Sequence, residues 1–206
     1  MYPQLDPSLP TGLLLIDSQR GFDDTSYWGE LSSNATYKTN IASLVSSFRT
    51  ARNAKESNIH ILHVGHASTN PASPLHPLHP SGGHAFYPFT SPEGDEPVFY
   101  KSVNSAFIGT KLESEIRARG IRQLVVAGLT TDHCVSTSVR MAANLEIVGS
   151  GNGEGRIILV DDATATYAKG KYDALTVHGV TVESLRGEFC EVWETERIVR
   201  EMGTFA

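Results

Sequence analysis

The sequence lacks a set of paired cysteines, a cluster of basic residues and a long apolar segment. Each absence excludes a class of protein. It has only two cysteines, Cys134 and Cys190, which lie 56 positions apart, so a disulfide scaffold is not expected. Its net charge is -6 and no run of Lys or Arg exceeds two residues, so it lacks the basic surface of a nucleic-acid-binding protein. No stretch approaches the roughly 20 apolar residues of a membrane span, and residues 1–7 do not resemble a secretion signal. We therefore expect a cytoplasmic protein that binds neither nucleic acid nor membranes.

What the sequence does contain is a regular alternation of apolar runs and amphipathic segments. The chain has 206 residues, of which 40% are hydrophobic, and this suits one domain with a buried core. The apolar runs predict strands at 11–17, 59–66, 97–100, 121–127, 156–161 and 189–192, and residues 161–167 predict a polar turn at the end of the fifth strand. Helical spacing predicts helices at 37–57, 110–119, 132–146, a segment containing 172–178, and 195–202. The alternation predicts a single α/β domain, residues 1–206, with helices on both faces of a parallel sheet.

A long loop at residues 67–96 interrupts this alternation. It holds six of the ten prolines and three histidines, His76, His79 and His84. Loops of this length in compact domains are usually functional, so we expect this insertion to set substrate preference or to form a subunit contact. The glycines between 149 and 155 resemble a phosphate-binding fingerprint, but they precede a strand instead of following one, so they predict a flexible loop.

Three residues with charged or nucleophilic side chains, Asp17, Lys101 and Cys134, come just after predicted strands. Because the carboxyl ends of parallel strands meet at one edge of a sheet, we expect the three to converge. Cys134 also lies in the first turn of a predicted helix, where free N–H groups and the helix dipole favour a thiolate. A carboxylate can take the thiol proton, and an ammonium group can stabilise both anions. Structural roles stay open for two of them, since Asp17 could cap a helix and Cys134 could be a small buried residue.

This combination predicts hydrolysis of an amide or similar carbonyl compound through a thioester. The backbone N–H of Cys134, with that of Thr130 in the Leu129–Thr130 turn, would form an oxyanion hole. Asp132 is expected to be a helix cap instead of a base, and Cys190 to be structural. The partner would be a small-molecule substrate. The residues that we expect to contact it, some of which could equally support the fold, are Gln19, Phe22, Asn104, Phe107 and His133.

Three segments resemble the signature segments of the isochorismatase-like cysteine hydrolases. They are LIDSQRGF at 15–22, KSVNSAF at 101–107 and VAGLTTDHCV at 126–135, and the resemblance extends roughly from residue 11 to residue 192. It implies a six-stranded parallel sheet in a Rossmann-like three-layer α/β/α sandwich, with an Asp-Lys-Cys triad. It also implies a non-proline cis peptide bond between Leu129 and Thr130, and a homo-oligomer, either a dimer or a tetramer.

The branches of this family differ in substrate. The nicotinamidase branch is similar in carrying an Asp-x-His motif for a divalent metal, but this chain has Val64-Gly65-His66 at that place, so neither a metal nor another cofactor is expected. The isochorismatase branch proper cleaves a vinyl ether and tends to lack the cysteine that is present here. A cysteine amidohydrolase acting on a small amide, ureide or lactam remains. The alternatives are a metal-assisted amidase that uses His66 with histidines of the 67–96 loop, and a binding or scaffold protein without catalysis.

Overall fold

A six-stranded sheet, all of whose strand pairs are parallel, forms the centre of the computed structural model, which describes residues 4–29, 33–54, 58–149 and 155–205. The strand order is β3-β2-β1-β4-β5-β6. The strands are β1 (Thr11–Ile16), β2 (Ile59–His66), β3 (Val98–Lys101), β4 (Gln123–Leu129), β5 (Arg156–Ala165) and β6 (Glu191–Trp193). The predicted α/β class and the parallel sheet are confirmed.

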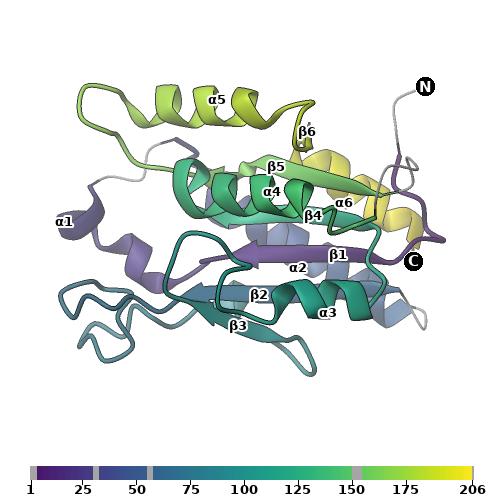
Figure 1. The fold of residues 1–206 in the computed structure, drawn as a ribbon, viewed down its shortest axis with the longest axis horizontal. Coiled ribbons are helices and arrows are strands. Elements are labelled where there is room, and N and C mark those ends of the chain that lie inside the picture. The colour runs from purple at the N-terminus through teal and green to yellow at the C-terminus, as the bar shows by residue number, and fades with distance from the viewer. Residues whose placement is uncertain (1–3, 30–32, 55–57, 150–154, 206) are drawn as a thin grey trace.

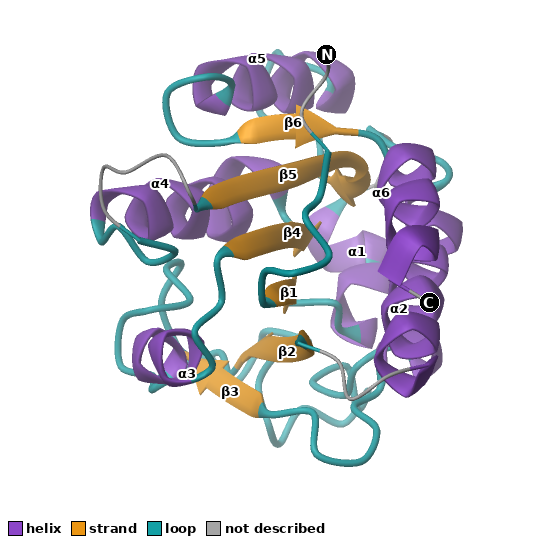
Figure 2. Ribbon diagram, turned by 90° about the vertical axis from the view of Figure 1, so that its right-hand side faces the viewer, coloured by secondary structure: helices purple, strands orange, loops and turns teal. Residues whose placement is uncertain are grey.

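Helices cover both faces of the sheet and complete a three-layer sandwich (Figures 1 and 2). On one face lie α2 (Tyr37–Ala54) and α6 (Thr195–Met202), and on the other α3 (Leu112–Ala118), α4 (Ser136–Asn144) and α5 (Ala174–Leu185). The short helix α1 (Thr25–Trp28) lies beyond the carboxyl end of β1. Single helical turns occupy Arg20–Asp23, Pro88–Thr90, Thr131–Val135 and Gly203–Phe205.

The central strands β1 and β4 are mainly apolar because both of their faces are buried. Leu13 and Leu15 of β1 belong to the core beneath α2 and α6, whereas Leu14 and Ile16 belong to the core beneath α3, α4 and α5. Successive side chains of a strand point to opposite faces, so a strand between two helical layers carries apolar residues on both faces. Burial of each aliphatic side chain contributes about 1.5–3 kcal/mol to the free energy of folding. This packing holds the ends of the central strands in fixed positions.

The structure corrects the prediction for residues 161–167. A polar turn was predicted there, but β5 continues to Ala165, with a register shift against β4 between Val126 and Gly128. Asp162 is accommodated in the strand because its carboxylate has partners: it accepts hydrogen bonds from the backbone N–H and the hydroxyl of Thr195, at 2.8 and 2.7 Å. The following helix, α5, begins at Ala174, where the Asp173 side chain caps it.

The loop at 67–96 is anchored at its carboxyl end by Glu96. The buried Glu96 carboxylate accepts hydrogen bonds from Arg49 and Arg52 of α2 and lies 2.8 Å from Nε2 of His63 in β2. His63 is therefore a core histidine. The glycine-rich stretch predicted as a flexible loop falls largely on 150–154, outside the described residues. No helix in the described part of the chain is long and apolar enough to span a membrane.

Candidate active site

The strand register brings the predicted reactive residues to one edge of the sheet. Ile16, the last residue of β1, pairs with Val64 of β2 and with Gly128 of β4. At the next pair of strands, His66 of β2 lies opposite Lys101 of β3. The residues that follow these positions therefore meet at the carboxyl edge, which is where open α/β sheets place their ligand sites.

Gly128 allows an unusually close approach of β4 to β1. Its φ is +134°, and a Cβ atom built at this position would lie 2.0 Å from the carbonyl oxygen of Ile16. Asp17 then leaves β1 with a left-handed backbone, φ 52°, while its N–H donates to the Val64 carbonyl at 2.7 Å. Asp residues tolerate this conformation better than most. The peptide bond between Leu129 and Thr130 is cis, as the resemblance implies.

The ammonium group of Lys101 contacts three acceptors. Its Nζ lies 2.6 Å from Oδ2 of Asp17, 3.2 Å from Sγ of Cys134 and 3.2 Å from Nδ1 of His66. The side chains of Asp17 and Lys101 are completely buried, and Cys134 is nearly so. The three residues predicted from the sequence thus converge, and they are joined by His66, which the sequence indicated only as an alternative metal ligand.

Burial decides the resting protonation of the thiol. It raises the pKa of Cys134, the neighbouring Asp17 carboxylate raises it further, and Lys101 offsets only part of this. Burial also raises the pKa of Asp17, again against the effect of Lys101. The expectation of a thiolate stabilised by a helix start is therefore not supported. Cys134 lies in a π-helical turn, Thr131–Val135, and desolvation there outweighs the effect of the turn.

A cavity of about 220 Å³ opens over these groups. Of the residues predicted to contact substrate, Phe22, Asn104 and His133 line it. The other lining residues are Asp17, Trp28, His66, Leu75, Thr130, Cys134, Tyr167 and Lys169. A larger hollow of about 840 Å³ lies between α2 and α6, but none of the candidate catalytic residues borders it, so we place the site in the smaller cavity.

Three aromatic side chains form one wall of the cavity. The rings of Phe22 and Trp28 are stacked with centroids 5.0 Å apart, and Tyr167 stacks on Trp28 at 5.9 Å. Polar ends hold the rings in place, because the Tyr167 hydroxyl donates to the Phe22 carbonyl at 2.7 Å and the Trp28 indole donates to the Gly21 carbonyl at 2.9 Å. We call Phe22, Trp28 and Tyr167 the aromatic wall. Only Phe22 was predicted, because Tyr167 and Trp28 are far apart in sequence.

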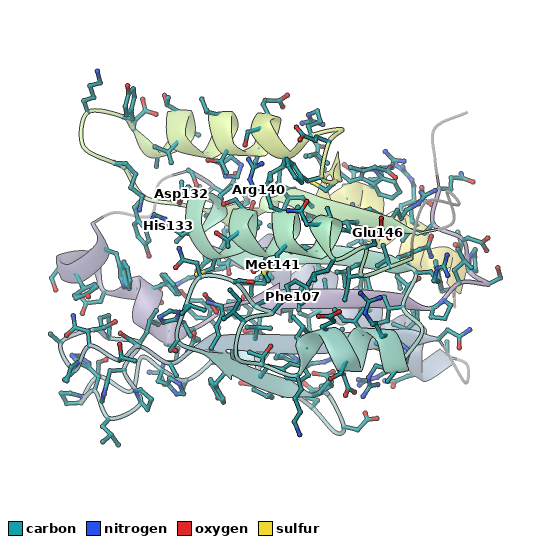
Figure 3. All side chains as sticks on the ribbon, viewed as in Figure 1. Phe107, Asp132, His133, Arg140, Met141 and Glu146 are labelled. Carbon is teal, nitrogen blue, oxygen red and sulfur yellow. The ribbon has the colours of Figure 1, made fainter. Side chains whose placement is uncertain are left out.

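Asp132 is part of a polar cluster at the cavity rim. It accepts a hydrogen bond from the Thr166 hydroxyl and lies 2.8 Å from Nδ1 of His133 and 3.5 Å from Nζ of Lys169. Burial opposes ionisation, but the hydrogen bonds from His133 and Thr166 hold the pKa of Asp132 below its usual range. The predicted cap role is wrong, since the residue before the turn is Thr130. Figure 3 shows Asp132 and His133 near the amino end of α4 and Glu146 at its other end.

Gln19 and Phe107 were predicted to contact substrate, but neither lines the cavity. Gln19 is completely buried and its amide group hydrogen-bonds the backbone of His66 in both directions, at 2.7 and 3.1 Å. Phe107 packs in the core beneath α3 and α4, and Met141 packs against the same core; both are labelled in Figure 3. Both therefore support the site, which was the alternative left open for Phe107. Cys190 is buried in the same core, as expected of a structural residue.

One group of potential metal ligands occurs within the described ranges. Atoms of Asp17, His66 and Cys134 lie within 4.8 Å of one another. The Lys101 ammonium contacts all three residues, so a divalent cation would have to displace a buried positive charge. His76 and His79 do not join this group. The geometry therefore does not favour the alternative of a metal held by His66 with the loop histidines.

Comparisons with known proteins agree on one family. The family model for the isochorismatase domain matches residues 11–188. The uncharacterized isochorismatase family protein YrdC of Bacillus subtilis is 32% identical over 194 residues, which cover 92% of this chain and 94% of that protein. The crystal structure of an isochorismatase-family protein from Chromobacterium violaceum is 36% identical, with a TM-score of 0.82 over 99% of this chain and 100% of that chain.

A second group of relatives is similar over a shorter stretch. The ureidoacrylate amidohydrolase RutB of Agrobacterium fabrum is 34% identical over 89 residues, which make up 43% of this chain and 36% of RutB. RutB proteins of other bacteria match over comparable lengths. The similarity thus covers little more than a third of RutB.

Proposed function

Because this chain belongs to the isochorismatase family of hydrolases, we propose that it hydrolyses the C–N bond of a small amide, ureide or lactam through a thioester on Cys134. The observation that carries the proposal is the position of the Lys101 ammonium, 2.6 Å from the Asp17 carboxylate and 3.2 Å from the Cys134 sulfur. An acid, a cation and a thiol in mutual contact beside a cavity are the groups that thiol-dependent acyl transfer requires.

In the first step, Asp17 takes the proton of the Cys134 thiol. Its Oδ2 is bonded to Lys101, whereas Oδ1 is buried without a hydrogen-bond partner among the described residues. A carboxylate oxygen in this state is a ready proton acceptor, and burial makes it a stronger base by raising the pKa of Asp17. As the proton leaves, the positive charge of Lys101 stabilises the thiolate that forms.

The thiolate then attacks the carbonyl carbon of the substrate and a C–S bond forms. The N–H groups of His133 and Val135 already donate to the Thr130 carbonyl, so those of Thr130 and Cys134 are the proposed donors to the oxyanion. Collapse of the tetrahedral intermediate breaks the C–N bond, and the leaving nitrogen takes the proton from Asp17. A water molecule, deprotonated by Asp17, then attacks the thioester, and the proton returns to sulfur as the C–S bond breaks.

The size and lining of the cavity support a small, planar substrate. About 220 Å³ accommodates a molecule of several heavy atoms, and the aromatic wall offers a flat surface on one side. The relatives named ureidoacrylate amidohydrolase support a ureide or a similar C–N compound, although they match over only part of their length.

The decisive experiment is a screen of small amides and ureides that follows ammonia release. We expect turnover with at least one compound, and loss of at least about a thousandfold in Cys134→Ala. Cys190→Ala is the matched control, because Cys190 is the other buried cysteine and lies away from the cavity. Intact-mass analysis of Cys134 during turnover should reveal the acyl adduct.

Other outcomes would favour the remaining hypotheses. Turnover that survives in Cys134→Ala contradicts the thioester mechanism. Turnover that is lost with a chelator and restored by zinc or iron would support a metal-assisted amidase. Absence of hydrolysis across the panel, together with ordinary reactivity of Cys134 toward iodoacetamide, would support a binding or scaffold protein.

A further inference from the structure

We propose that His66 is a positioning residue, the third acceptor that fixes the Lys101 ammonium in the orientation that the proposed hydrolysis needs. The inference rests on the proposed function and assigns a role within the same site. An alkylammonium group has three N–H donors. In this structure they face Oδ2 of Asp17, Sγ of Cys134 and Nδ1 of His66. Two of these acceptors take part in the proposed chemistry, and His66 is the one that does not react.

The third contact matters because Lys101 is buried. Its side chain has no exposure to solvent, so an N–H group without an acceptor could not turn to water. Leaving a buried donor unsatisfied costs about 1–3 kcal/mol, and more for a charged group. Without His66, the ammonium group would be more stable if it rotated toward Asp17. Its contact with the Cys134 sulfur would then weaken. Position 66 therefore needs an acceptor, whatever else its side chain does.

The fold holds His66 firmly in place. It is the last residue of β2 and pairs in register with Lys101 itself. The buried amide of Gln19 accepts from its N–H at 2.7 Å and donates to its carbonyl at 3.1 Å, and the same amide donates to the carbonyl of His84 at 2.7 Å. This double contact explains why Gln19 is buried behind the cavity and does not line it.

The protonation of His66 suits this role. Accepting a hydrogen bond at Nδ1 requires a neutral ring that carries its proton on Nε2. Burial lowers the pKa of His66, and the charges of Lys101 and His84 lower it further, to about 4. The titratable groups that face the ring are Lys101, Asp17, Cys134 and His84. The His66 ring is therefore neutral over the pH range in which the Cys134 thiol must react.

The experiment compares His66→Phe, which keeps a ring but loses the acceptor, with His66→Asn, whose Oδ1 can accept near the position of Nδ1. The first measurement is the rate of Cys134 alkylation by iodoacetamide from pH 6 to pH 10, which needs no substrate. We expect the rate at pH 8 to fall about tenfold in His66→Phe, with the titration displaced to higher pH, and to stay within about threefold of the parent in His66→Asn. His60→Phe is the control, because His60 is another histidine of β2 and its ring contacts Arg119 instead of Lys101.

The second measurement uses a substrate from the screen. A positioning role predicts a fall in kcat of about tenfold or more in His66→Phe, with KM changed less than about threefold, and recovery in His66→Asn. Should His66→Phe fail to fold, His66→Ala measured with and without added imidazole replaces it, and imidazole is expected to restore the alkylation rate. Parent-like alkylation in His66→Phe, or equal impairment in His66→Phe and His66→Asn, or no effect of imidazole on His66→Ala, overturns the proposal. Because alkylation is independent of turnover, failure of the proposed function is seen separately, as turnover that survives in Cys134→Ala.

Discussion

Asp17 and Lys101 form an ion pair in which 2.6 Å separates Oδ2 from Nζ and neither side chain has any exposed surface. Removing two charges from water is costly, and a buried pair recovers that cost only while both partners are present. The pair connects the end of β1 with the end of β3, which are not neighbours in the sheet. The candidate site and the packing of the sheet edge therefore depend on the same contact.

Replacing only one member of this pair should destabilise the protein strongly. We expect Lys101→Met to lower the free energy of unfolding by about 3–5 kcal/mol, because it leaves the Asp17 carboxylate buried without its cation. The double variant Asp17→Asn/Lys101→Met should recover much of this loss while staying inactive. Unfolding in urea measures the stability of the single variant and of the double variant. Lys38→Met is the control, since Lys38 pairs with Asp23 at a largely exposed position, and its effect should stay below about 1 kcal/mol. A Lys101→Met variant as stable as the control would contradict the prediction.

Gly128 should tolerate no side chain. An alanine Cβ would lie 2.0 Å from the Ile16 carbonyl oxygen, so β4 would have to separate from β1 or distort. We expect Gly128→Ala to destabilise the fold by at least about 3 kcal/mol and to abolish turnover, since the spacing of Asp17 and Cys134 would change. Gly179→Ala is the matched control: Gly179 lies within α5 with open space around its Cβ position, so alanine should be neutral or mildly stabilising. Equal thermal midpoints for the two variants would show that the contact is less restrictive than the distance indicates.

The aromatic wall should affect substrate binding more than the rate of the chemical step. Trp28→Ala removes the central ring of the stack, and we expect KM to rise about tenfold with kcat changed less than about threefold. Trp28→Phe should retain most of the binding. Tyr172→Ala serves as the control, because Tyr172 is an exposed aromatic residue that does not line the cavity. A fall in kcat with an unchanged KM would mean that the wall acts on the reacting groups instead of on the bound substrate.

Glu96 should make the stability dependent on pH in the acid range. Burial alone would raise the pKa of Glu96, but hydrogen bonds from His63 and Arg49 outweigh it and hold the pKa well below 4.5. A carboxyl group with a lowered folded-state pKa adds stability above its unfolded pKa, and this stability is lost as the pH falls. We therefore expect stability to decline below about pH 4.5, and Glu96→Gln to be about 3 kcal/mol less stable at pH 7 with a flatter decline. Unfolding in urea between pH 7 and pH 3 measures this. Glu93→Gln, at an exposed partner of Arg49, should change little, and equal slopes in the two variants would contradict the prediction.

Much of the fold could be predicted because its signals are local. Leu13–Ile16 and Leu124–Ala127 are apolar at every position, as expected of strands buried on both faces. Once the sheet is parallel, the position of Asp17, Lys101 and Cys134 just after strands is enough to predict that they converge. The cis peptide bond came from the resemblance alone, since nothing in the composition of the Leu129–Thr130 turn indicates it.

The remaining features depend on contacts between distant segments. Asp161 and Asp162 indicated a turn, and the place of Asp162 in β5 became clear only from its partners in α2 and α6, Asn40 and Thr195. The role proposed for His66 depends on the register between β2 and β3, which alternation does not encode. The raised pKa of Cys134 was missed for the same reason: position at the start of a helical turn is visible in the sequence, whereas desolvation is not.

The residues that would select a substrate and those that would react with it belong to different parts of the fold. Phe22 and Trp28 lie in short helical turns after β1, and Tyr167 lies just beyond β5, whereas strand register fixes Asp17, Lys101 and Cys134. Libraries that vary only these connecting segments should therefore retarget the protein to new compounds while the proposed nucleophile, Cys134, and the proposed base, Asp17, keep their spacing. The segments that would recognise a substrate can thus be redesigned without moving the strand ends that hold Asp17, Lys101 and Cys134.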